Sequence, residues 1–97
     1  MTTATELEQA FRARGVTRGG ALYLSAAEAM AMVDAARSAS VRVLGIDGFR
    51  IGPNTTQPLM EHSCDLSDET RAKNPWQAAI EFISRQPADL SFEVILE

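Results

Sequence analysis

The chain has 97 residues and a formal net charge of −4, and 45% of its residues are hydrophobic and 23% charged. These values are ordinary for a globular protein, and the length allows one hydrophobic core but excludes two independent ones. We therefore expect a single domain over residues 1–97, with an N-terminal helical extension at residues 1–20 and the core at residues 21–97.

The distribution of charge and cysteine restricts the partners and the compartment. Residues 49–97 carry eight acids against four bases, which equals the whole net charge. Phosphate contacts need clustered lysine and arginine, so we expect no direct binding of nucleic acid. The single cysteine cannot form an internal disulfide. No stretch has the form of a signal peptide or the roughly 20 apolar residues of a membrane span. These features predict a cytoplasmic protein that does not contact membranes.

Three segments have the sequence pattern of amphipathic helices. Residues 5–14 place apolar side chains at helical spacing. Ser25 with Glu28 three residues later is a capping box and predicts the start of a second helix. Asn74, followed by proline and then by glutamine at the third helical position, predicts the start of another. The expected buried positions of the second and third helices are Ala26, Ala29, Met30, Val33, Ala36, Trp76, Ala79, Ile80 and Ile83.

Three further segments have the pattern of strands. Residues 41–46 and 49–52 flank the dipeptide Asp47-Gly48, which suits the type I′ turn of a hairpin. Residues 57–66 form the next expected strand. Alternation then puts four of its side chains on the inward face. These are Met60, His62, Cys64 and Leu66.

The final segment completes the expected fold. Residues 91–97 alternate Phe92, Val94 and Leu96 inward. Residues 20–24 are either a short strand or the lead-in to the following helix. The predicted fold class is α+β, with a mainly antiparallel sheet of about four strands and helices packed on one face. The strand order is left open by the pattern.

His62 and Cys64 are the only residues of their kinds and suggest one alternative function, a small cysteine-dependent enzyme. A cysteine nucleophile requires a base within hydrogen-bond reach and usually a third orienting group. Asp65 is expected to point to the opposite face, and two ligands are too few for a zinc site. We therefore expect that both side chains pack beneath a helix. No catalytic residue, metal ion or cofactor is predicted.

An acidic surface is expected on the side of the sheet that no helix covers. Strand alternation directs Glu61, Asp65 and Glu93 outward, and the apolar Leu59 and Ile95 fall on the same side, where they would supply the centre of an interface. The other interpretation is an ordinary polar sheet face. Further members of the expected surface are Asp47, Arg50, Asp68, Glu69 and Glu97.

The run VLGIDGFRI at residues 43–51 is the most distinctive part of the chain. Together with the alanine-rich helix before it, CDLSDE at residues 64–69, PWQAAIEFI and the terminal FEVIL, it resembles bacterial immunity proteins. The likeness is to the immunity protein 40 type of polymorphic toxin systems and to the immunity proteins of anticodon-cutting colicins. It covers roughly residues 22–97, and residues 1–20 have no counterpart in it.

This resemblance implies a protein that binds a cognate toxin domain, expected to be a basic nuclease, and blocks its active site. An acidic inhibitor would then occupy a groove that otherwise holds phosphates. We expect a monomer, while exposed sheet edges leave an oligomerising structural protein as another alternative. The residues placed near the toxin are Asp47, Arg50, Glu61, Asp65, Asp68, Glu69 and Glu93.

Overall fold

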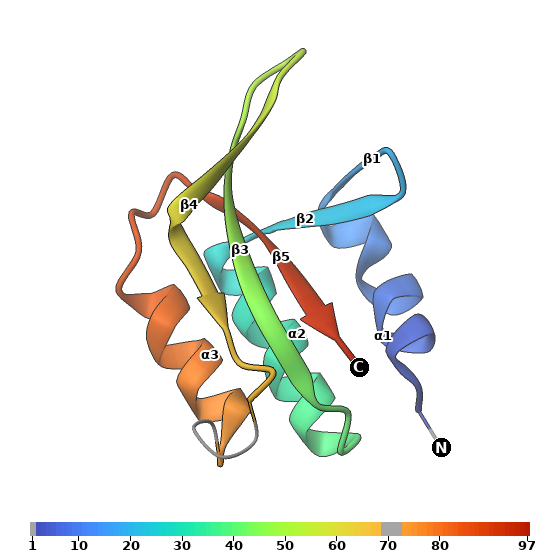
Figure 1. The fold of residues 1–97 in the computed structure, drawn as a ribbon. Coiled ribbons are helices and arrows are strands. Elements are labelled where there is room, and N and C mark those ends of the chain that lie inside the picture. The colour runs from blue at the N-terminus through green and yellow to red at the C-terminus, as the bar shows by residue number, and fades with distance from the viewer. Residues whose placement is uncertain (1, 69–72) are drawn as a thin grey trace.

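The computed structural model describes residues 2–68 and 73–97 and contains three α-helices and five strands in these ranges (Figure 1). The elements in chain order are α1 (Ala4–Phe11), a short 3-10 helix η1 (Arg12–Arg14), β1 (Val16–Arg18), β2 (Ala21–Ser25), α2 (Ala26–Ser38), β3 (Val43–Ile51), β4 (Thr56–Asp65), α3 (Pro75–Ser84) and β5 (Ser91–Leu96).

The strands form one sheet in the order β1-β2-β5-β3-β4, and every neighbouring pair is antiparallel. Helices α2 and α3 lie side by side over one face of this sheet, and α1 packs beside α2 (Figure 1). The predicted α+β class is confirmed. The sheet has five strands where about four were expected, because β1 and β2 add two strands before α2, while the two strands expected at 41–46 and 49–52 are one continuous strand, β3.

Local capping signals fix where the two core helices begin. The Ser25 hydroxyl accepts a hydrogen bond from the Glu28 amide (3.3 Å) at the start of α2, and the Asn74 side chain accepts one from the Gln77 amide (3.1 Å) at the start of α3. Both starts were predicted, since a cap satisfies an amide that the helix itself leaves unpaired. The buried face of α2 differs slightly from expectation, with Met32 fully buried.

The core lies between these helices and the inward side of the sheet. Phe92 and Val94 of β5 are buried there, as the alternation of the final strand predicts, and Ile46 of β3 is buried beside them. Leu7 and Phe11 of α1 belong to the same hydrophobic cluster. Helix α1 therefore packs as part of the core. Strand β5 lies between β2 and β3 in the middle of the sheet.

The predicted turn at Asp47-Gly48 is wrong. β3 continues through both residues, and the chain reverses after Gly52, whose amide donates to the Thr55 carbonyl (2.8 Å). The reason is tertiary, because β3 is paired on both sides, with β4 and with β5. A Cβ atom on Gly48 would lie 2.5 Å from the carbonyl oxygen of His62, so glycine is required there for the close approach of β4.

A two-residue hairpin turn occurs instead between β1 and β2. Gly19 and Gly20 have φ angles of 57° and 84°, as a type I′ turn requires. The preceding residue, Arg18, reaches from this hairpin to the turn between β3 and β4 and joins the two. Its guanidinium donates to the Gly52 carbonyl (2.6 Å), the Thr55 carbonyl (2.7 Å), the Thr56 hydroxyl (3.1 Å) and the Pro53 carbonyl (3.5 Å).

The edge strand β4 makes a large bulge against β3. Asp47 alone lies opposite residues 60–63, because the register changes between the pairs on either side of them. Met60, which was expected to point inward, is 81% exposed. His62 within the bulge is held by Gln86 after α3, through a hydrogen bond of 2.6 Å. A bulge of this kind breaks the regular edge and discourages pairing with another chain.

Candidate functional site

The face of the sheet opposite α2 and α3 carries three carboxylates, one each from β5, β3 and β4. Asp47 of β3 lies directly across from Glu93 of β5, and Gly45 of β3 lies between Asp65 of β4 and Ile95 of β5. Residues that are directly opposite in an antiparallel pair share a face. Asp47, Asp65, Glu93 and Ile95 therefore share one surface, which we call the open face.

A groove of about 390 Å³ runs over the open face beside the β4 bulge. Its floor includes Gly45, where the absence of a side chain leaves room above the sheet. The groove follows from the bulge, because residues 60–63 turn away from the regular strand path next to Asp47. The other lining residues are Leu44, Met60, Ser63, Cys64, Asp65 and Ile95.

Asp65 stands at the end of β4, where two hydrogen bonds hold its carboxylate. Its Oδ1 atom accepts from the amide (2.9 Å) and from the hydroxyl (2.6 Å) of Ser67. Both bonds favour the ionised form and lower the pKa of Asp65. The Oδ2 atom accepts no hydrogen bond within residues 2–68 and 73–97, so an oriented negative charge is presented at the groove.

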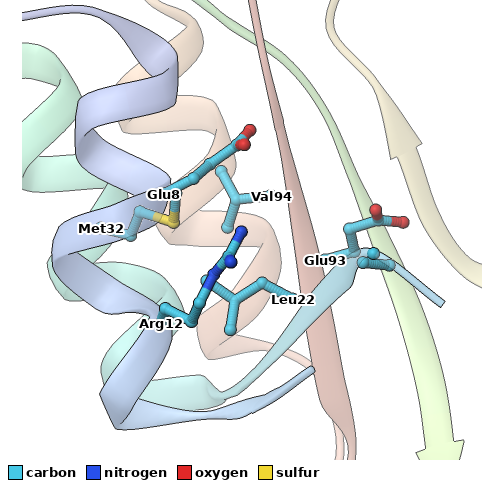
Figure 2. A pocket seen from close by; sticks show the side chains of 8 residues that line it. Glu8, Arg12, Leu22, Met32, Glu93 and Val94 are labelled. Carbon is cyan, nitrogen blue, oxygen red and sulfur yellow. The ribbon is translucent and has the colours of Figure 1, made fainter. Parts of the chain in front are cut away.

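Glu93 lies in a more enclosed and more negative environment. Its pKa is raised by partial burial, and then by the negative charges of Asp47 and Glu8. Glu93 extends from β5 near a small cavity of about 60 Å³, which Glu8 and Arg12 of the N-terminal segment also line (Figure 2). The electrostatic cost of its ionisation falls when a cation approaches, so this part of the open face favours a positively charged partner.

The remaining predicted contact residues do not join this group. Arg50 pairs with Gln57 and alternates to the side opposite Asp47. Leu59 packs against the hydrophobic core, so its expected outward position is wrong, because the bulge reverses the parity of β4. Glu69 lies outside the described residues. Glu61, Asp68 and Glu97 are exposed but are absent from the groove lining.

His62 and Cys64 are close in sequence but have different surroundings. Gln86 donates through Nε2 to the Phe82 carbonyl (3.0 Å), which leaves its Oε1 to accept from His62 Nδ1. Cys64 packs partly against the core, and burial followed by the charge of Asp65 raises the pKa of its thiol. No hydrogen bond joins the two side chains among the described residues. These features favour a neutral thiol and do not support a thiolate nucleophile.

The described ranges hold neither a metal-binding cluster nor a membrane-spanning helix. No cluster of three or more histidine, cysteine, aspartate or glutamate side chains has the arrangement needed to hold a metal ion there. Within the same ranges, no helix has both the length and the apolar character that crossing a bilayer requires.

Comparison with known proteins adds no relative to this picture. The chain matches no model of a known protein family, and a search of curated proteins returned no significant match.

Proposed function

We propose that this protein is an immunity protein, which acts in the cytoplasm by binding a basic toxin domain through the open face and blocking its active site. The observation that carries the proposal is the gathering of Asp47, Asp65 and Glu93 on the uncovered side of the sheet, where Asp47 and Asp65 line an apolar-sided groove and Glu93 lies across from Asp47. Among the described residues, no cation forms an ion pair with any of the three.

The chemistry of this surface suits a protein that binds phosphates. The active site of a nuclease is positively charged, and an array of carboxylates can occupy it in place of the nucleic-acid backbone. Complementary charge of this kind raises the association rate and sets specificity. The apolar side chains of Ile95 and Met60 supply contact area that charge alone does not provide.

The motif likeness supports the same function. The run VLGIDGFRI corresponds to β3, which contributes Asp47 to the open face and Gly45 to the floor of the groove. The most distinctive part of the sequence therefore coincides with the centre of the candidate site.

The test compares capture of a partner by two triple variants. Asp47→Asn with Asp65→Asn and Glu93→Gln removes the charge of the open face at nearly constant shape. The control removes three exposed charges elsewhere. Its substitutions are Asp34→Asn, Glu81→Gln and Asp89→Asn.

We expect the wild type and the control to retain the same protein from the native cell, and the open-face variant to lose it. That protein is then expressed in a host, where it should arrest growth alone and be neutralised by co-expression of the wild type. Equal neutralisation by the open-face variant, or the absence of toxicity in the captured protein, would refute the proposal.

A further inference from the structure

The groove on the open face has the room and the chemistry to admit one long cationic side chain. It combines a glycine floor at Gly45, two apolar walls from Ile95 and Met60, and two carboxylates from Asp47 and Asp65. Its volume of about 390 Å³ exceeds what the stem of one side chain needs, and the groove is open to solvent. It is thus able to admit a side chain from a docked surface.

We infer that the partner inserts one arginine or lysine side chain into this groove, an inference that rests on the proposed function and specifies the contact made at the same site. The aliphatic stem lies over Gly45 between Ile95 and Met60, and the charged group meets Asp47 and Asp65. Long cationic side chains bury their methylene groups on apolar surface while the charged end keeps polar contacts.

Charge complementarity selects this occupant. Asp65 already uses Oδ1 for Ser67, so its orientation is set before binding and Oδ2 remains available to accept a hydrogen bond. Hydrogen bonds from an ionised donor to an ionised acceptor are among the strongest in proteins. A second copy of this chain is a poor occupant, because like carboxylates would face each other and the chain carries a net charge of −4.

The β4 bulge explains why the groove is present at all. Gly45 is paired with Asp65 of β4, but a regular edge strand would also keep its backbone directly beside Asp47. The displaced residues 60–63 leave that space open, and Met60 is presented as one wall with 81% of its surface exposed. His62 fixes the detour through its bond to Gln86 (2.6 Å), so the groove is formed before any partner arrives. Preformed sites bind without a cost of ordering.

The test uses the whole chain labelled with ¹⁵N and N-acetyl-arginine amide as the probe, with the uncharged N-acetyl-citrulline amide as its control. We expect the arginine compound to shift the amide resonances of Gly45, Asp47 and Ile95, and the citrulline compound to leave them unchanged. Asp65→Asn should weaken binding of the arginine compound by about tenfold. The matched substitution Asp89→Asn, at an exposed acid elsewhere, should leave binding unchanged.

A second variant tests the contact with the stem. Met60→Ala should weaken binding of the arginine compound and leave binding of methylguanidinium, which has no stem, unaffected. Met60 is so exposed that its truncation should not unfold the protein. Three results would refute the inference. They are equal binding of the citrulline and arginine compounds, resonance shifts spread evenly over all acidic surfaces, and an equal loss of binding in Asp65→Asn and Asp89→Asn.

The outcome of this test is separate from that of the proposed function. If the arginine compound does not bind in the groove but capture of the partner still depends on the open-face charges, the toxin-binding surface stands without this contact. A probe that occupies the groove while the open-face variant still captures and neutralises the same toxin would instead remove the proposed function.

Discussion

Replacing Arg18 with methionine removes the only described side chain that joins the turn of the β1–β2 hairpin to the turn of the β3–β4 hairpin. The guanidinium donates to the carbonyls of Gly52 (2.6 Å) and Thr55 (2.7 Å), with a longer bond to the Thr56 hydroxyl (3.1 Å). Methionine keeps an apolar stem of similar length and loses all of these donors. The variant therefore measures the hydrogen bonds with little change in packing.

The size of the expected loss in unfolding free energy depends on how exposed the acceptor carbonyls are. A hydrogen bond to a charged group contributes about 1.5–3 kcal/mol when it is well shielded. The carbonyls here are partly exposed and are rehydrated once the guanidinium is gone, so we take about 1 kcal/mol for each of the two short bonds. The expected loss is about 2 kcal/mol of unfolding free energy, which corresponds to a fall of about 10 °C in the melting temperature of a chain of this size.

Urea unfolding followed by the fluorescence of the single tryptophan, Trp76, measures this free energy. Arg50→Met is the matched control, because Arg50 is exposed in the same hairpin and has no hydrogen bond or ion pair with any residue in 2–68 or 73–97. Exchange of the Gly52 amide should also accelerate in Arg18→Met, since its bond to Thr55 loses support. A loss under about 0.5 kcal/mol, or one equal to that of Arg50→Met, would show that Arg18 does not hold the two turns together.

Three further predictions test the packing and the electrostatics. Gly48→Ala should destabilise the fold by about 1–3 kcal/mol in urea unfolding, because the new Cβ would meet the backbone of His62, and an unchanged midpoint would contradict the close approach of β4. Phe92→Ala should cost about 3–5 kcal/mol by leaving a cavity under α2, and a loss of less than half of this would place Phe92 outside the core. Burial, followed by the charges of Asp47 and Glu8, raises the folded-state pKa of Glu93, so its ionisation destabilises the native state as pH rises through the ordinary glutamate range. Glu93→Gln should therefore be more stable than wild type near neutral pH and no more stable than wild type in acid. The same stability difference between variant and wild type at both pH values would refute this cause.

Much of the helical structure could be predicted because its signals are local. The hydroxyl of Ser25 and the side chain of Asn74 each satisfy an amide three residues away, so both helix starts depend on a few consecutive residues. The final strand is similar, since the alternation of Phe92 and Val94 states which side of β5 must be buried wherever that strand is placed in the sheet.

The candidate site was predictable only in part. Alternation correctly directs Asp65, Glu93 and Ile95 away from the helices, and these residues do share the open face. It places Leu59 and Met60 on the wrong sides, because a bulge changes the parity of β4 and nothing in the period of two announces it.

The conformation at Asp47-Gly48 was also decided by tertiary pairing and not by the local sequence. The dipeptide is compatible with a tight turn, and its local sequence does not exclude one. Pairing of β3 with two other strands at once keeps the chain extended, and glycine serves there to admit the backbone of His62. The Gly19-Gly20 turn, the bridge from Arg18 and the groove over Gly45 likewise depend on strands that are distant in the chain. Capping and alternation are properties of neighbouring residues and can be recognised in the sequence, whereas register, bulges and the surface they shape arise only when separate segments meet.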